Sequence, residues 1–179
     1  NNIINKIIEI GNINNDKIVM EIGAGYGHLT KAIICKKPKK IFAVEKDKKL
    51  ASLLKKKFKN YKNLKIINRD ILNIIEEKNL DQDMIVFGNL PYNVSTKILA
   101  SLIMLKDWPP WYDVLILMFQ KEVADRILAK KQTKEFSRLT VLSNWRLEIK
   151  KHFDVSKNCF FPRPKINSTL LSFKPKINN

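Results

Sequence analysis

The sequence predicts an α/β fold: a mainly parallel sheet covered by helices on both faces, with an antiparallel hairpin at one edge. Short runs rich in β-branched residues alternate with segments of helical periodicity along most of the 179 residues. Near the C-terminus two such runs follow each other without a helix between them. Neighbouring parallel strands need a crossover connection, usually a helix, whereas antiparallel neighbours do not. The two consecutive strands therefore predict an antiparallel hairpin at the C-terminal end of the chain.

The first half of the chain alternates helix and strand signals regularly. Isoleucines at positions 3, 4, 7 and 8 give NIINKIIEI one apolar helical face. The runs KIVMEIG, KIFAVE, LKIIN and MIVFGN are short and rich in β-branched residues, as strands are. Asp47 stands where an N-cap is needed after the second run. These signals predict strands over 17–23, 40–45, 64–68 and 84–89, and helices over 2–10, 27–36, 48–58 and 71–78.

The second half begins with a helical pattern, the very apolar run DVLILMF and another helical pattern. A further helix precedes RLEIKKHF and, past a proline-rich turn, STLLSF, which are the two runs of the expected hairpin. No repeat, linker or low-complexity block divides the chain, so we expect one domain over residues 1–179. The predicted helices cover 95–105, 121–131 and 137–144, and the predicted strands cover 113–119, 146–153 and 168–173.

Composition indicates a cytoplasmic protein. Hydrophobic residues make up 45% of the chain, which suits a globular core. No apolar run approaches the roughly 20 residues that span a bilayer, and no signal-peptide pattern opens the chain. Cys35 and Cys159 are far apart, and His28 and His152 lack partners at metal-ligand spacing, so we expect reduced thiols and no metal. Because no segment is typical of a coiled coil, we expect a monomer.

The charge favours nucleic acid as the partner. The formal net charge is +17, from 34 Lys and Arg residues against 17 Asp and Glu residues. The chain is also rich in Lys, Asn and Ile together, a composition that an AT-rich genome favours whatever the function. The lysine runs at 36–40 and 55–59 are therefore equally compatible with solvated faces. The same two interpretations apply to Arg126, Arg138 and Lys165, which are candidate phosphate contacts.

The ends of the predicted strands carry the functional signal, because open α/β sheets bind ligands beyond the carboxyl ends of their strands. The first strand ends in EIGAGYGHLT, whose Gly23, Gly25 and Gly27 allow a sharp turn close to a ligand. A dinucleotide fingerprint needs a small residue where His28 stands. With Glu21 before it, the loop suits a ligand whose charged part is an amino acid; a purely structural glycine turn is the alternative.

Acidic residues follow the next two strands. Glu45 lies about 20 residues after the glycines, where a carboxylate can accept both hydroxyls of a ribose. Asp70 can accept a hydrogen bond from the exocyclic amine of adenine, while Ile71 packs against the ring. Either acid alone could be a helix N-cap. Together with the glycine loop, they describe an adenosine ligand with an amino-acid tail, S-adenosylmethionine.

The fourth strand ends in GNLPY, beside the expected methyl group of that ligand. The exocyclic nitrogen of adenine is a poor nucleophile because its lone pair is delocalised into the ring. The Asn89 side-chain oxygen and the carbonyl of Leu90 or Pro91 can hold its two hydrogens and aim the lone pair at the methyl carbon. Tyr92 can stack on the base. A plain turn explains the glycine and the proline, but not the amide and the tyrosine.

The stretches EIGAGYGHLT, VEKD, NRDIL, GNLPYN, FQKEVADRI and FFPRPKINS together resemble the ribosomal RNA adenine N6-dimethyltransferases. The similarity runs along nearly the whole chain and is strongest to the branch that acts on small-subunit RNA. It implies a seven-stranded Rossmann-like methyltransferase sheet, S-adenosylmethionine as donor and no metal. It also implies transfer of two methyl groups to each of two adjacent adenosines in the 3′-terminal hairpin of 16S ribosomal RNA, late in assembly of the small subunit.

The resemblance also implies roles for residues at matching positions. The candidate catalytic residues are Asn89, Leu90, Pro91, Tyr92 and Phe160, with Phe160 covering the second face of the adenine. The candidate cofactor-binding residues are Glu21, Gly23, Ala24, Gly25, Glu45, Lys46, Asp70, Ile71 and Asn89. Members of this family normally begin with a basic segment containing Q-N-F-L that closes over the cofactor, and they carry a C-terminal helical domain that helps to grip RNA. We expect both parts to be missing from a sequence that runs from NNIINKI to KPKINN.

Three alternatives stay open. Macrolide-resistance methyltransferases modify an adenine of large-subunit RNA with the same fold and chemistry, although WPPW at 108–111 and FQKEVADRI are more similar to the small-subunit branch. A non-catalytic ribosome assembly factor would be expected to have lost Asn89 or Tyr92, and both are present. A small-molecule methyltransferase is disfavoured by that base-gripping pair and by the charge.

Overall fold

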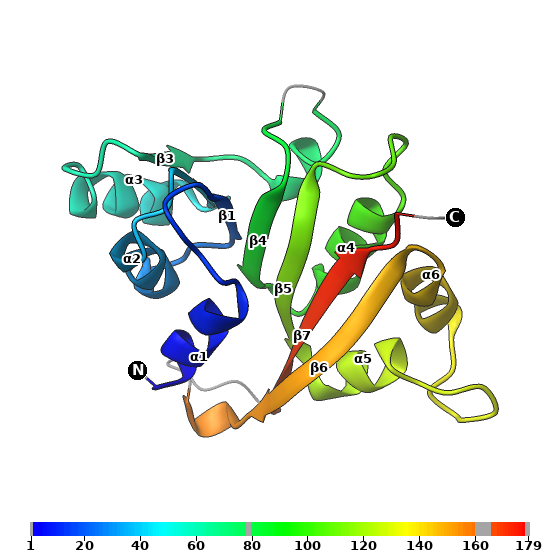
Figure 1. Ribbon diagram of the computed structural model, residues 1–179. Coiled ribbons are helices and arrows are strands. Elements are labelled where there is room, and N and C mark those ends of the chain that lie inside the picture. Colours follow the sequence, from blue (N-terminus) through cyan, green and yellow to red (C-terminus); the bar gives the residue numbers. More distant parts are fainter. Residues whose placement is uncertain (1, 78–79, 160–165, 178–179) are drawn as a thin grey trace.

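The computed structural model describes residues 2–77, 80–159 and 166–177, and these form one sheet of seven strands (Figure 1). The strand order is β3-β2-β1-β4-β5-β7-β6. Strands β1 to β5 run parallel, whereas β7 is antiparallel to both β5 and β6. The expected mainly parallel sheet with a C-terminal antiparallel hairpin is confirmed. The strands are β1 (Ile18–Ile22), β2 (Lys40–Val44), β3 (Leu64–Ile67), β4 (Met84–Asn89), β5 (Tyr112–Gln120), β6 (Leu147–Val155) and β7 (Ser168–Pro175).

Helices cover both faces of the sheet and create two hydrophobic cores. One core contains apolar residues of α1, α2 and α3, and the other contains those of α4, α5 and α6. Side chains along β4 alternate between them: Met84 and Val86 enter the second core, while Ile85 and Phe87 enter the first. The helices are α1 (Asn2–Ile10), α2 (His28–Cys35), α3 (Lys48–Lys57), α4 (Ser95–Ile103), α5 (Lys121–Ile127) and α6 (Arg138–Arg146).

Two helix predictions depend on local chemistry and are confirmed. Ile7 and Ile8 of α1 are buried, and Ile3 and Ile4 pack against the same core. The Asp47 side chain accepts hydrogen bonds from the backbone N–H groups of residues 49 and 50, at 2.7 and 2.9 Å, and so caps α3.

The expected helix over 71–78 is wrong in type and length. The described residues form a short 3₁₀ helix, η1 (Ile71–Asn73), and then a turn. Ile71, Ile74 and Ile75 are all buried, and the Trp111 indole donates a hydrogen bond to the Ile75 carbonyl at 3.0 Å. Contacts with the core and with an indole 36 residues away therefore shape this segment more than its own helical propensity does.

The helices predicted over 95–105 and 121–131 end earlier, at Ile103 and Ile127. At the end of α4, the Arg146 guanidinium donates to the carbonyls of Ile103 and Leu105 at 3.1 and 2.8 Å. The same guanidinium lies over the rings of Trp108 and Trp145, at 4.7 and 4.2 Å from their centres. One residue of α6 thus caps the end of α4 and contacts Trp108.

The order of the strands decides where a ligand site can form. From β1 the chain moves outward to β2 and β3, and from β4 it moves outward in the opposite direction to β5. β1 and β4 are direct neighbours, with Ile22 opposite Gly88 near their carboxyl ends. This is the point at which the strand order reverses, where open α/β sheets leave a crevice for ligands.

Candidate functional site

The fold brings the predicted residues of β1 to β4 to one edge of the sheet. Gly23 follows β1, Glu45 follows β2 and Asn89 is the last residue of β4. Asp70 lies three residues beyond β3, after Ile67. Because these strands are parallel and adjacent, their carboxyl ends form a continuous row across the reversal point.

The glycine loop after β1 lies beside the turn after β4. Gly23 has φ +74°, and a side chain added there would lie 3.7 Å from the Asn89 carbonyl oxygen. At Gly27, with φ +76°, an added Cβ would lie 2.6 Å from Phe58 and 2.7 Å from Leu54. The first glycine keeps the space beside Asn89 open, and the second allows α3 to pack directly against the loop.

Glu45 holds the glycine loop in place. Its carboxylate accepts hydrogen bonds from the backbone N–H groups of Gly25 and Asp47, both at 2.8 Å. The residue is 9% exposed. A carboxylate can accept about four hydrogen bonds, so two of its lone-pair positions are left for other donors, such as ligand hydroxyls.

Glu21 lies under this loop, fully within the fold. The Thr30 hydroxyl of α2 donates a hydrogen bond to its carboxyl group at 2.5 Å. Burial raises the pKa of Glu21 from 4.5 to about 8; the Thr30 bond works against this shift, and the nearby Glu45 charge adds to it. With 2% exposure, the side chain supports the loop from below rather than facing solvent.

Asp70 forms an ion pair with another predicted residue. The Lys46 ammonium lies 2.8 Å from one carboxylate oxygen, and the Leu72 N–H donates to the other at 3.1 Å. The hydrogen bond from Lys46 is the main reason why the pKa of Asp70 is lowered. Ile71 beside it is buried. The segments after β2 and β3 are therefore linked by charge.

In the turn after β4, some polar groups are free to bind a ligand and others form hydrogen bonds within the protein. The Asn89 side chain is exposed and Leu90 is buried. The Pro91 carbonyl accepts the Val94 N–H at 3.1 Å, whereas the structure gives the Leu90 carbonyl no partner among the described residues. The Tyr92 hydroxyl lies 3.2 Å from Ser168 Oγ. Of the two carbonyls predicted to accept a hydrogen bond from a base amine, the Leu90 carbonyl is therefore the better candidate, because the Pro91 carbonyl already accepts one hydrogen bond.

Sequence reasoning missed Ser168. It is fully buried at the start of β7, and its only signal in the sequence is its place at the end of FFPRPKINS. Only the antiparallel pairing of β7 with β5, in which Ser168 lies opposite Gln120, brings it to the carboxyl edge.

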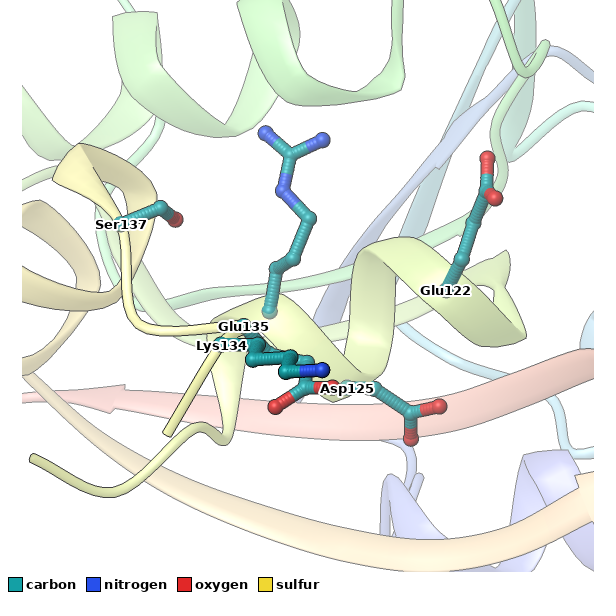
Figure 2. Close-up of a pocket in the computed structure, with 6 residues that line it drawn as sticks. Glu122, Asp125, Lys134, Glu135 and Ser137 are labelled. Carbon is teal, nitrogen blue, oxygen red and sulfur yellow. The ribbon is translucent and has the colours of Figure 1, made fainter. Parts of the chain in front are cut away.

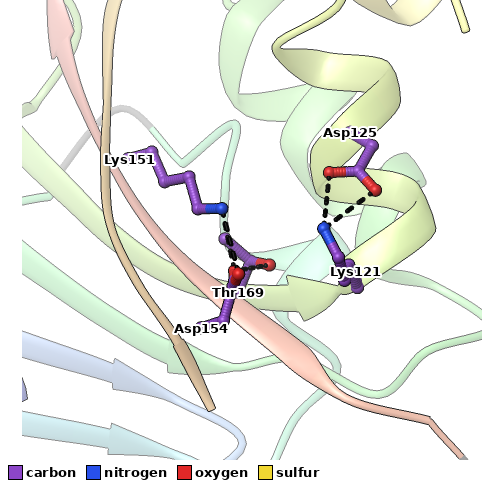
Figure 3. A network of polar contacts seen from close by, with 5 residues as sticks. All are labelled: Lys121, Asp125, Lys151, Asp154 and Thr169. Atoms are coloured by element: carbon purple, nitrogen blue, oxygen red, sulfur yellow. Dashed lines mark hydrogen bonds and ion pairs between the residues drawn. The ribbon is translucent and has the colours of Figure 1, made fainter.

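A polar network braces the sheet beside Ser168 (Figure 3). The Thr169 hydroxyl donates to Asp154 at 2.7 Å, and Lys151 pairs with the same carboxylate. Next to it, Lys121 at the start of α5 pairs with Asp125. The hydrogen bond from Thr169 is the main cause of the lowered pKa of Asp154. The Thr169–Asp154 bond joins β7 to β6, whereas the Lys121–Asp125 pair lies within α5.

The remaining predicted residues lie apart from the strand ends or outside the described residues. Phe160 and Lys165 belong to the second group. Arg126 lines an open hollow of about 360 Å³ between α5 and the segment before α6, together with Glu122, Asp125, Lys134, Glu135 and Ser137 (Figure 2). Arg138, the first residue of α6, is exposed nearby. The hollow mixes both signs of charge and contains none of the strand-end residues.

Two further features were looked for among the described residues: a cluster of metal ligands and a membrane-spanning helix. Within residues 2–77, 80–159 and 166–177, no group of three His, Cys, Asp or Glu side chains could hold a metal ion. In the same ranges no helix has both the length and the apolar character needed to cross a membrane. Cys35 is an exposed free thiol.

A mostly parallel seven-stranded sheet, with a glycine loop after β1 and an antiparallel C-terminal pair, is the Rossmann-like fold of methyltransferases. A family profile described as "Ribosomal RNA adenine dimethylase" matches residues 1–179. The chain belongs to that family.

Named relatives and solved structures agree with this assignment. The "Ribosomal RNA small subunit methyltransferase A" of Pelagibacter ubique (strain HTCC1062) is 51% identical over 98% of this chain, and that of Malacoplasma penetrans (strain HF-2) is 44% identical over 98%. The chain spans 66% and 62% of the lengths of these two relatives. A dimethyladenosine transferase from Plasmodium falciparum has a TM-score of 0.84 at 32% identity, covering 98% of this chain and 62% of that one. The 23S rRNA methyltransferase ErmE has a TM-score of 0.80 at 24% identity, covering 98% of this chain and 68% of that one, and so shares the fold.

Proposed function

We propose that this chain is the catalytic domain, over residues 1–179, of an S-adenosylmethionine-dependent rRNA adenine N6,N6-dimethyltransferase. One observation carries the proposal: the glycine loop after β1 lies beside the Asn89 turn, so that a Cβ added at Gly23 would be 3.7 Å from the Asn89 carbonyl oxygen. A donor held by that loop and a base held by that turn would therefore be neighbours, as direct methyl transfer requires.

The residues at the strand ends fit the proposed cofactor. Glu45 keeps two acceptor positions for ribose hydroxyls while its other two hold Gly25 and Asp47. Asp70 is ionised at neutral pH and can accept a hydrogen bond from an adenine amine, with Ile71 beside it. Bound S-adenosylmethionine would supply a methyl group activated by a sulfonium. Glu21, Ala24 and Lys46 would act by shaping the loop and placing Asp70.

The turn after β4 fits the proposed target base. Asn89 Oδ1 and the Leu90 carbonyl would accept the two hydrogens of the exocyclic nitrogen. That would direct its lone pair away from the ring and toward the methyl group. The Tyr92 ring, fixed through Ser168, would stack on the base. Phe160 is proposed for the other face. In this mechanism the rate comes from orientation and hydrogen bonding, without a general base of unusual pKa.

The proposed substrate is the 3′-terminal hairpin of small-subunit (16S) RNA in an immature small subunit, where two adjacent adenosines would each receive two methyl groups. The names of the relatives at 51% and 44% identity favour small-subunit RNA over the large-subunit alternative. The net charge of +17 supports an RNA partner. We propose a cytoplasmic monomer, in keeping with a role in ribosome biogenesis.

Methyl transfer tests the proposal directly. Small ribosomal subunits lacking dimethyladenosine are incubated with radiolabelled S-adenosylmethionine and either this chain or a version extended to the length of its relatives. Dimethyladenosine is expected in the RNA. Asn89→Ala should lower the rate by about 100-fold or more, because it removes one of two acceptors made for the amine.

A matched control separates chemistry from folding. Asn15→Ala removes an exposed amide just before β1, at the edge of the sheet opposite the candidate site, and should leave the rate unchanged. If the extended chain folds, binds the cofactor and methylates large-subunit RNA but not small subunits, then the proposed substrate is wrong and large-subunit RNA takes its place. An extended chain that folds and binds the cofactor but methylates neither would leave a non-catalytic assembly factor as the better explanation.

A further inference from the structure

We propose that the exposed end of α3, the turn that follows it and the adjoining part of the glycine loop form a second RNA-binding surface, which holds the RNA backbone and unpaired bases beside the methylation site. We name it the α3 surface and define it by Lys55, Lys56, Lys59, Lys62, Tyr26 and Tyr61, all of them exposed. The inference rests on the proposed function, because it takes RNA to be the substrate.

The charge on this face is unbalanced. Residues 48–62 contain seven lysines and no Asp or Glu. Lys55, Lys56, Lys59 and Lys62 form no ion pair with any described residue. A cation in the last turn of a helix is explained by the helix dipole, but that effect ends within the turn, and Lys59 and Lys62 lie beyond Lys57, where α3 ends. The patch therefore has the field of a phosphate-binding surface.

Aromatic rings are placed among these charges. Tyr26 is 59% exposed and Tyr61 is 45% exposed, so both rings present surface on which a base can stack. Tyr61 packs edge-on against the buried Phe58, with 6.1 Å between ring centres, so it is held at the surface and is not loose. A surface that binds single-stranded nucleic acid has two parts: lysines placed along the phosphate backbone, and exposed rings on which bases stack.

The α3 surface is built onto the candidate active site. The Lys57 ammonium donates to the Tyr26 carbonyl at 2.7 Å and lies over the Phe58 ring, so Lys57 ties the end of α3 to the glycine loop. Gly25 of that loop is held by Glu45, and Gly23 lies against Asn89. Figure 1 shows α3 beside α2 at the β3 edge of the sheet. RNA with its target base at Asn89 would pass the glycine loop before it reached the α3 surface.

Neutralising the lysines tests the inference. The fourfold variant Lys55→Gln, Lys56→Gln, Lys59→Gln and Lys62→Gln is compared with a control of equal charge, Lys106→Gln, Lys131→Gln, Lys150→Gln and Lys174→Gln. All four control lysines are exposed and without an ion pair to a described residue. The probe is a labelled RNA hairpin with a single-stranded flank, and its affinity is measured at several salt concentrations.

The α3 variant should bind the hairpin at least about tenfold more weakly at low salt, and its salt slope should fall by about 0.7 for each phosphate that the protein no longer neutralises. The control should change little in slope. Tyr61→Ala should bind about fivefold or more weakly while Tyr61→Phe keeps its affinity, since stacking needs the ring and not the hydroxyl. Melting temperatures should stay the same in the two fourfold variants and in Tyr61→Phe, and Tyr61→Ala should still unfold in one cooperative transition although it loses the contact with Phe58. S-adenosylmethionine affinity should stay the same in all variants, which excludes unfolding as the cause of weaker RNA binding.

Other outcomes would overturn the inference. Equal decreases in affinity for the α3 variant and the control would mean that only total charge matters. Unchanged RNA affinity together with abolished binding to vesicles of anionic phospholipid would assign the face to a membrane. Failure of the proposed function is separate: it would appear as wild-type protein that binds the hairpin through the α3 surface yet transfers no methyl group to any ribosomal RNA.

Discussion

The Tyr92 hydroxyl lies 3.2 Å from Ser168 Oγ, which connects the turn after β4 to the first residue of β7 across 76 positions of sequence. If this bond fixes the ring that stacks on the base, Tyr92→Phe and Ser168→Ala should each slow methyl transfer by about 2- to 10-fold. The double variant should be no slower than the worse single variant, because both remove one interaction. Single-turnover rates measure this effect.

Ser101→Ala, which removes a half-buried hydroxyl of α4, is the matched control and should leave the rate unchanged. A double variant whose rate decrease equals the product of the two single decreases would show that the hydroxyls act independently.

Glu45→Gln should weaken S-adenosylmethionine binding by about 10- to 100-fold. The carboxylate accepts two backbone N–H groups at 2.8 Å, and a glutamine amide would point its own NH₂ at one of them. Calorimetric titration measures the affinity. Glu148→Gln, an exposed change on β6, is the control. Equal affinities for the wild type and Glu45→Gln would mean that Glu45 only shapes the loop.

Glu21→Gln should flatten the dependence of stability on pH. The pKa of Glu21 is about 8 in the fold and 4.5 when exposed, so between these values the native state keeps a proton that the unfolded chain has released. The Glu21 contribution to stability is therefore complete below 4.5, falls as pH rises, and is lost above about 8. Glutamine is uncharged and can still accept the Thr30 bond.

Urea unfolding at about pH 5, 6.5 and 8 measures this difference. Relative to wild type, Glu21→Gln should gain a few kcal/mol of unfolding free energy across the window. Glu9→Gln, an exposed change on α1, should show no such trend. A constant difference between Glu21→Gln and wild type at every pH would contradict the raised pKa.

Gly27→Ala and Gly25→Ala separate backbone strain from steric overlap. Both glycines have positive φ, +76° and +54°, so the conformation costs either alanine about 1 kcal/mol. At Gly27 an added Cβ would also lie 2.6 Å from Phe58, whereas at Gly25 the nearest atom is 4.0 Å away. Gly27→Ala should therefore lower the unfolding free energy by about 3 kcal/mol or more. Equal decreases in a urea titration would show that α3 shifts freely.

Predictions from the sequence are confirmed where the local structure depends only on interactions between residues a few positions apart. The isoleucine spacing of α1 and the Asp47 cap of α3 depend on residues within one or two turns, and both are confirmed. The helix predicted over 71–78 is wrong because contacts of the described residues with the Trp111 indole and the core determine their conformation. Ser168 was missed for the same reason, since strand pairing creates its contact with Tyr92.

By itself, the sequence determined the alternation of strands and helices, the hairpin at the end and the residues that stand at the strand ends, because side-chain periodicity and turn chemistry act over a few residues. Only the tertiary structure decided that the Gly23 loop meets the Asn89 turn, that Glu21 is sealed beneath it with a raised pKa, and that Lys46 pairs with Asp70. Those relationships depend on the order in which distant strands pack side by side, and on the exclusion of water when they do.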